Sequence, residues 1–140
     1  MTEIVYARDS ALSVDEYIDV VGNSDLGATR PIADRERVAR MIAGSNLVVT
    51  ARLDGRCIGL ARTIADFAWT AYCCDLAVHD DFQGRGIGKA LLQASKEALG
   101  EEVGLALFSM PGAVPFYDKL EPIGMKRNGD GYFWTRTRGV

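Results

Sequence analysis

The sequence predicts a mixed α/β fold, in which an antiparallel meander of strands precedes a βαβ-like crossover. Two long apolar runs flank Asp54-Gly55, a dipeptide that is typical of two-residue hairpins. A third apolar run leads into the glycine-rich stretch DFQGRGIGK, after which apolar residues recur at helical spacing. The chain has 140 residues, of which 48% are hydrophobic and 25% charged, and this suits a single domain over residues 1–140.

The N-terminal part of the chain is expected to form one strand and two helices. EIVYARD, residues 3–9, reads as the strand. Ser13 is the expected cap of a helix over residues 13–24, because apolar residues recur there at helical spacing. A loop runs up to Pro31, and residues 32–44 follow as an amphipathic helix that ends in glycine.

The middle of the chain predicts three long strands, over residues 46–53, 56–64 and 71–78. A helix over residues 88–99 follows, with its apolar positions on one face and a glycine directly after its end. VGLALF, residues 103–108, is wholly apolar, as expected of a short strand that is buried on both faces.

The C-terminal part is predicted to form a short helix and one or two closing strands. GAVPFYDKL, residues 112–120, has Pro115 near its start, where proline suits a helix. IGMKRN and GYFWTRT, residues 123–128 and 131–137, read as strands around an Asn128-Gly129 turn.

Composition and charge argue against several classes of function. The net charge is −3 and no run of Lys or Arg occurs, so neither a nucleic-acid interface nor a membrane-surface role is expected. No apolar stretch approaches the roughly 20 residues of a membrane span, and the N-terminus lacks the pattern of a secretion signal. Three cysteines, two of them adjacent, and a single histidine predict no disulfide framework and no metal site. We expect a cytoplasmic protein with reduced thiols.

The glycine-rich turn has the features of an anion-binding site. It lies between a strand that ends at Val78 and the start of the next helix, where first-turn N–H groups lack partners within the helix. Glycines at 84, 86 and 88 leave those N–H groups accessible to a bulky anion, because they carry no Cβ. Arg85 and Lys89 add positive charge at the same place. A pyrophosphate is the expected ligand.

Two familiar nucleotide-binding motifs match this turn poorly. A P-loop would need glycine and a hydroxyl residue where Gln83 and Ala90 stand. A Rossmann fingerprint beginning at Gly84 would need glycine in place of Lys89 and an acidic residue near Phe108.

The pattern that does match is Q/R-x-x-G-x-G/A, over Gln83 to Gly88. Here the sequence resembles the GNAT superfamily of acyl-CoA-dependent N-acyltransferases. DLAVHDDFQGRGIGKALL, residues 75–92, is similar to that family's main cofactor segment, and GAVPFYDKL is similar to its second segment, which carries an aromatic FY pair. The resemblance covers the chain from about Asn46 onward, and the two leading helices also fit it.

The resemblance implies a central, mostly antiparallel sheet with helices on both faces and a splay between the fourth and fifth strands. Acyl-CoA would lie in that splay, and a primary amine would attack the thioester of acetyl-CoA directly, in a ternary complex. By position, the expected cofactor-binding residues are the strand residues Leu76, Ala77 and Val78, together with the turn residues Gln83, Gly84, Arg85, Gly86, Ile87, Gly88 and Lys89.

The resemblance also suggests catalytic residues. Tyr117 matches the tyrosine of the FY pair and is the expected acid for the leaving thiolate. Some relatives carry a glutamate on the fourth strand where Tyr72 stands, which leaves Asp75 as the only acid of this strand. Asp75 is a candidate base, but alternation points it away from Leu76 unless a bulge intervenes, and capping a turn or pairing with an arginine is an equal alternative. Ordered water is a further candidate base, and His79 is expected at the surface.

The acceptor is expected to contact less patterned parts of the chain, namely residues 23–31, 62–69 and 132–134. The candidate acceptor-binding residues are Arg30, Asp66, Phe67 and Tyr72. Aspartates here would attract an ammonium group, whereas Arg30 and Arg62 would bind a carboxylate. Polyamine-like and amino-acid-like acceptors both stay open.

Three rival interpretations remain beside a small-molecule N-acetyltransferase. One is a non-catalytic acyl-CoA-binding regulatory domain, which the missing strand carboxylate favours and Tyr117 disfavours. The second is a different acyl donor, such as succinyl-CoA. The third is a protein acetyltransferase that acts on lysines or N-termini. A homodimer through the aromatic segment YFWTRT is also compatible with the resemblance.

Overall fold

The computed structural model of the chain describes residues 3–138, which divide into two compact units with the boundary between Leu107 and Phe108. The first unit holds the sheet and the predicted cofactor turn. The second holds the short helix and the C-terminal segment. The single domain over residues 1–140 stays a prediction.

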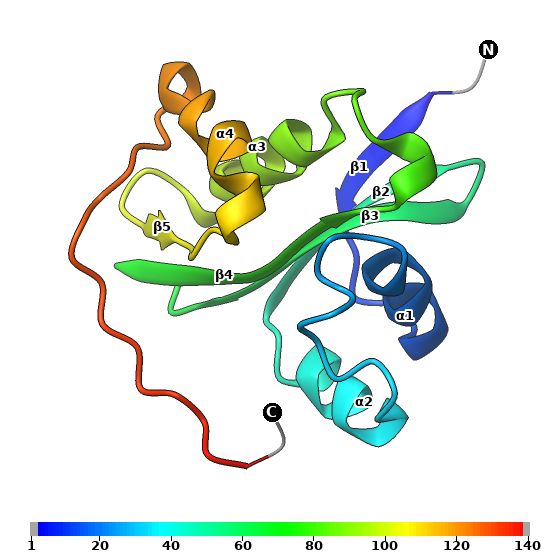
Figure 1. Cartoon of the computed structure of the whole chain (residues 1–140). Coiled ribbons are helices and arrows are strands. Elements are labelled where there is room, and N and C mark those ends of the chain that lie inside the picture. Colours follow the sequence, from blue (N-terminus) through cyan, green and yellow to red (C-terminus); the bar gives the residue numbers. More distant parts are fainter. Residues whose placement is uncertain (1–2, 139–140) are drawn as a thin grey trace. The chain divides into compact units, whose positions relative to one another are not determined.

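The first unit is built on a five-stranded sheet in the order β1-β2-β3-β4-β5 (Figure 1). Its strands are β1 (Ile4–Arg8), β2 (Leu47–Leu53), β3 (Arg56–Ala65), β4 (Thr70–Val78) and β5 (Gly104–Ala106). The first four pair antiparallel with their neighbours, and β5 pairs parallel with β4. This confirms the predicted mixed sheet, with a meander before a crossover.

The hairpin between β2 and β3 forms where its dipeptide predicts it. Asp54 has φ 52° and Gly55 has φ 80°, so both central residues are left-handed. A two-residue turn of this kind matches the twist of the flanking strands, and Asp-Gly is one of the pairs that tolerate it.

Three helices cover the two faces of the sheet. In Figure 1, α1 (Val14–Gly22) and α2 (Arg35–Ala43) lie on one face, and α3 (Ile87–Leu99) lies on the other. The helix α1 begins as predicted, because Ser13 and Glu16 form a reciprocal capping box. The helix α2 begins later than predicted, because Asp34 accepts a hydrogen bond from Arg37 N and caps it there.

Close packing of α3 on the sheet explains a glycine inside β3. A Cβ at Gly59 would lie 3.2 Å from both Ile87 Cγ2 and Leu91 Cδ1. Both of these side chains are buried, and the missing Cβ lets the helix approach the strand.

The sheet opens between β4 and β5. The strand β5 is shorter than predicted and pairs only with Thr70, Ala71 and Tyr72. Within residues 3–138, no strand pairs with Cys73–Val78 on the side of β4 that faces β5. We call this side of Cys73–Val78 the open edge of β4. The fold therefore has the splay that the resemblance implied.

In the second unit, α4 (Val114–Asp118) forms within the predicted helical range, but the two closing strands are absent from residues 124–138 as the structure describes them. The predicted strands over 123–128 and 131–137 are therefore wrong. Tyr132 and Trp134 are each 96% exposed. Gly129 and Asp130, which lie between the two segments, have little β-propensity, and a lone two-stranded hairpin is marginal in water.

Candidate cofactor site

The turn between β4 and α3 has the predicted geometry of an anion site. Gly84 has φ 78° and Gly86 has φ 75°, so both need the left-handed region that glycine tolerates. Gly86 is the N-cap of α3, and no side chain caps this helix end. The helix therefore presents its first-turn N–H groups and the positive end of its dipole to the surface.

The other predicted turn residues divide by exposure. Gln83, Arg85 and Lys89 are exposed, whereas Ile87 and Gly88 are buried where α3 packs on the sheet. Ile87 therefore offers its main chain and not its side chain to a ligand. The Arg85 guanidinium carbon lies 5.3 Å from the ring centroid of Phe82, and a cation–π contact of this kind holds a guanidinium in place.

Two side-chain hydrogen bonds hold the segment that connects the end of β4 to the turn. Gln83 Nε2 donates to Val78 O over 3.2 Å. His79 Nδ1 accepts from Asp81 N over 3.1 Å. His79 is only 7% exposed, so its expected place at the surface is wrong. Its ring packs edge-on against Phe82, and this contact with the capping bond explains its burial.

Hydrogen bonds of β4 show which main-chain groups face the open edge. His79 N donates to Ile58 O, so the main chain of His79 faces β3. Because strand residues alternate, the main-chain groups of Ala77 also face β3, and those of Leu76 and Val78 face the open edge. Two of the three predicted strand residues therefore present amides there, and the Val78 carbonyl is taken by Gln83.

A β-bulge interrupts β4 immediately before these residues. Arg62 pairs with Asp75 and Thr63 pairs with Cys73, which leaves Cys74 without a partner residue in β3. The bulge lies before Asp75 and not between Asp75 and Leu76, so these two side chains still point to opposite faces of the sheet.

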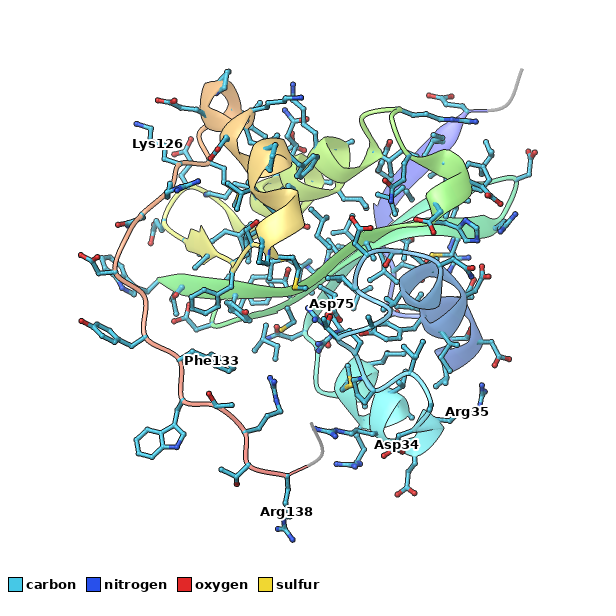
Figure 2. All side chains as sticks on the ribbon, in the orientation of Figure 1. Asp34, Arg35, Asp75, Lys126, Phe133 and Arg138 are labelled. Atoms are coloured by element: carbon cyan, nitrogen blue, oxygen red, sulfur yellow. The ribbon has the colours of Figure 1, made fainter. Side chains whose placement is uncertain are left out.

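Asp75 lies on the face of the sheet that α1 and α2 cover, in a buried network of hydrogen bonds (Figure 2). Its Oδ1 accepts from Arg30 Nε over 2.5 Å. Its Oδ2 accepts from Arg62 Nε over 2.6 Å and from the Tyr17 hydroxyl over 2.7 Å. We call Tyr17, Arg30, Arg62 and Asp75 the Asp75 network. Among a base, a turn cap and a partner of arginine, the contacts of Asp75 favour the partner of arginine.

Electrostatics of the Asp75 network agree with this interpretation. Burial by itself raises the pKa of Asp75, but the charges of Arg62 and Arg30 outweigh it and hold the pKa below its ordinary value. Burial, followed by the charge of Asp75, raises the pKa of Tyr17, which stays a protonated donor. A carboxylate with a lowered pKa that already accepts three donors is a poor proton acceptor.

The candidate acceptor-binding residues lie in two places. Arg30 belongs to the Asp75 network and is partly exposed, with 24% of its side chain accessible. Asp66 Oδ1 accepts from the amides of Ala68, Trp69 and Thr70, and these bonds lower its pKa. Asp66 therefore shapes the loop between β3 and β4.

The two aromatic candidates lie near that same loop. Phe67 is 40% exposed and has a left-handed φ of 59°. Tyr72 is 38% exposed, and burial of its remainder raises its pKa. Neither feature identifies an acceptor.

Tyr117 lies on α4 in the second unit. Its ring packs edge-on against Phe116, with 5.0 Å between the ring centroids. Tyr117 is partly exposed. Tyr117 thus occupies a helix, as its motif predicts, and its catalytic role stays a prediction.

The thiols do not form a nucleophilic site in this structure. Burial raises the pKa of Cys57 to about 11 and that of Cys73 to about 12, and the half-buried Cys74 shifts in the same direction for the same reason. Thiols with raised pKa values are poor nucleophiles at neutral pH. Among residues 3–138, no group of three or more His, Cys, Asp or Glu side chains is placed to hold a metal ion.

Tyr17 is the network member that the sequence analysis missed. It is fully buried on α1, and its position among apolar residues at helical spacing suggests a core aromatic. A buried tyrosine hydroxyl requires a partner, and that requirement is the signal that could have found it.

Comparisons with known proteins agree with this geometry. The family model described as an acetyltransferase (GNAT) domain matches residues 22–132. An uncharacterized N-acetyltransferase, ycf52, from Porphyra purpurea is 36% identical over 85 residues, which are 56% of this chain and 47% of that protein. The chloroplastic GCN5-related N-acetyltransferase 2 of Arabidopsis thaliana is 37% identical over 83 residues, 55% of this chain and 31% of that protein. The matches thus span about half or less of these relatives.

A solved structure shows the same fold. The aminoglycoside N-acetyltransferase AAC(6')-Iy, in complex with CoA, superposes with a TM-score of 0.73 at 14% identity, over 98% of this chain and 97% of that one. In residues 3–138 of this chain, no helix has the length and apolar character needed to cross a membrane. The glycine turn, the open edge of β4 and the family match over most of the chain together show that this chain belongs to the GNAT acetyltransferase family.

Proposed function

We propose that this protein transfers an acetyl group from acetyl-CoA to a primary amine by direct attack in a ternary complex. The observation that carries the proposal is the uncapped N-terminus of α3, with left-handed glycines at 84 and 86, directly after the open edge of β4. The turn suits a pyrophosphate. The edge offers main-chain groups of Leu76 and Val78 to a pantetheine arm.

The reaction requires a neutral amine and a stabilised oxyanion. The amine nitrogen bonds to the thioester carbon, the carbon–sulfur bond breaks, and the nitrogen loses one proton while the thiolate gains one. An open-edge amide of β4 is the proposed donor to the oxyanion. Since Asp75 is occupied by its arginines, we propose that water removes the proton from the amine.

Tyr117 is the proposed acid for the leaving thiolate. Replacing it by phenylalanine should lower kcat with little change in the affinity for acetyl-CoA, because only the hydroxyl is lost. Steady-state kinetics with wild type as the reference tests this. Unchanged turnover would remove Tyr117 from the mechanism.

Cofactor binding is the first test of the proposal. Gly86→Ala forces a Cβ onto a left-handed residue in the turn, and Gly55→Ala does the same in the β2–β3 hairpin at a similar φ. Neither new Cβ would meet an atom within 4 Å, so the two variants differ in location and not in crowding. Calorimetry with CoA should show affinity reduced about tenfold or more for Gly86→Ala and nearly unchanged for Gly55→Ala. Absence of binding by the wild type would overturn the proposal.

The second test separates catalysis from simple binding. Release of CoA thiol from acetyl-CoA should be measured with glycine, spermidine and a lysine-containing peptide as acceptors. Turnover of glycine or spermidine supports a small-molecule enzyme, whereas turnover of the peptide alone supports the alternative of a protein acetyltransferase. Binding of CoA without thiol release from any amine would favour the non-catalytic alternative. A cytoplasmic location and a homodimer stay predictions.

A further inference from the structure

We propose that Arg30 is a positioning residue: it holds the bulge of β4 at Cys74 and so sets which main-chain groups of that strand face acetyl-CoA. The inference rests on the proposed function for its consequence, since the open edge of β4 is the proposed cofactor edge. We call the hydrogen bonds from Arg30 to Cys74 and Asp75 the clamp, and both lie within the first unit.

Two hydrogen bonds show that the bulge reverses the alternation of β4. Asp66 N donates to Thr70 O, so Thr70 faces β3 at the start of the strand. His79 N donates to Ile58 O, so His79 also faces β3 just past its end. Residues that face the same neighbour are an even number of positions apart in a regular strand, and these two are an odd number apart. One extra residue must therefore lie between them, and the pairing identifies Cys74.

The reversal decides what the cofactor meets. With the bulge, the main-chain groups of Leu76 and Val78 face the open edge, and those of Ala77 face β3. Without it, the alternation that starts at Thr70 would turn Ala77 to the open edge and pair Leu76 and Val78 with β3. The bulge thus decides that Leu76 or Val78, and not Ala77, supplies the amide that is proposed for the oxyanion.

Arg30 contacts the bulge and its neighbour at the same time. Its Nη2 donates to the carbonyl oxygen of Cys74 over 2.8 Å. Its Nε donates to Asp75 Oδ1 over 2.5 Å. The guanidinium thus bridges the extra residue of the bulge and the first residue after it, with the fixed fork geometry that arginine provides and lysine does not.

The remaining contacts hold this bridge rigidly. Arg62 and Tyr17 fix the other carboxylate oxygen of Asp75. Arg62 also reaches Ser45 Oγ, over 3.2 Å, beside the end of α2. The Asp75 side chain is fully buried, so water does not replace any of these donors without opening the structure.

Arg30 also ties the loop between α1 and α2 to the strand. Its Nη1 donates to Thr29 Oγ1, and Thr29 Oγ1 donates to Leu26 O. This loop is the predicted acceptor region, so a change in the loop on acceptor binding would reach the bulge through a single side chain. Acceptor contact and cofactor geometry are thereby linked.

The charge balance makes Arg30 a selective place to test the clamp. The network holds two guanidinium groups and one carboxylate. Removal of Arg30 leaves Asp75 paired with Arg62 and hydrogen-bonded to Tyr17, so the fold should persist while the Cys74 carbonyl loses its donor. Arg30→Met removes both hydrogen bonds, and Arg30→Lys keeps the charge but supplies a single ammonium group.

The experiment compares these variants with Arg35→Met, in which an exposed arginine of α2 is lost. Hydrogen exchange of the amides of Asp75 and Ala77, which face β3, should accelerate about tenfold in Arg30→Met, with β1 and β2 unchanged. With the amine that the wild type acetylates fastest, kcat should fall about tenfold or more, because a misplaced oxyanion donor costs rate. Affinity for CoA should change less than about threefold, since the pyrophosphate turn is untouched. Arg30→Lys should lie between Arg30→Met and wild type, and Arg35→Met should match wild type.

Unchanged exchange of the Asp75 and Ala77 amides in Arg30→Met would overturn the clamp. An Arg30→Lys variant equal to wild type would also overturn it, because charge alone would then suffice. Exchange is measured without cofactor or acceptor, so it reports on the clamp even if the wild type fails to bind CoA. Failure of the wild type to bind CoA would overturn the proposed function, but it would not change what hydrogen exchange shows about the clamp.

Discussion

Two clusters of charged side chains connect α1 to different strands of the sheet, and their ratios of positive to negative groups are inverse. In the Asp75 network, two guanidinium groups share one carboxylate whose side chain is fully buried. In the second cluster, which we call the Arg52 cluster, one guanidinium is shared by Asp9 and Glu16. Those two acids keep 16% and 29% of their side chains exposed.

The two clusters differ in what a charged group can still contact after its partner has been removed. Asp9 also accepts from Thr50 Oγ1, and Glu16 also belongs to the capping box of α1. Water reaches both acids, so losing one leaves Arg52 with the other. Within residues 3–138, neither guanidinium of the Asp75 network forms an ion pair with a second carboxylate, and the Asp75 side chain has no access to water. Removing the shared member of that network should therefore be the most costly change.

Asp75→Asn tests this directly and should have the largest effect. The substitution leaves two guanidinium groups facing a neutral amide in a buried place. We expect the free energy of unfolding to fall by about 3–5 kcal/mol, as for other broken buried ion pairs. Chemical denaturation at pH 7 measures it, and a loss below about 1 kcal/mol would show that the network adds little.

The pH dependence of stability should also distinguish Asp75→Asn from the wild type. Asp75 has a lowered pKa in the folded state, so its contribution is fully present above the unfolded value of about 4 and is lost as pH falls through the folded value. The stability difference between wild type and Asp75→Asn should therefore shrink from pH 7 towards pH 2. Denaturation midpoints across this range give the trend, and a constant difference would contradict it.

Asp9→Asn, in the Arg52 cluster, should have a smaller effect. Arg52 keeps both hydrogen bonds to Glu16, and the new amide still accepts from Thr50. We expect a loss of about 1 kcal/mol at pH 7, the usual net value of one such hydrogen bond. The same denaturation series serves as the measurement. A loss equal to that of Asp75→Asn would remove the proposed difference between the two clusters.

Asp15→Asn should have the smallest effect. Asp15 pairs with Arg35, which Figure 2 shows at the outer side of α2, and the two side chains are 80% and 60% exposed. An exposed ion pair contributes about 0–1 kcal/mol and weakens with salt. Denaturation at low and high salt checks this, and an effect above about 2 kcal/mol would show a role beyond pairing.

Local chemistry explains the predictions that succeeded. The Ser13 cap, the Asp54-Gly55 hairpin and the left-handed glycines at 84 and 86 each depend on residues within a few positions of one another. The start of α2 was predicted too early, because Asp34 lies inside the predicted range and caps the helix there. This is also a local effect. His79 was misplaced because its capping bond and its contact with Phe82 appear only in the folded turn.

By itself, the sequence determined the order of elements of the first unit, the turn that suits a pyrophosphate and the resemblance that the family match confirms. Only the tertiary structure decided the partners of Asp75 and the bulge at Cys74. The donors to Asp75 come from positions 13, 45 and 58 residues away, and no local pattern encodes a contact that loop closure has to bring together. The same reason applies to the C-terminal segment. Residues with high strand propensity form a stable strand only when a second strand pairs with them.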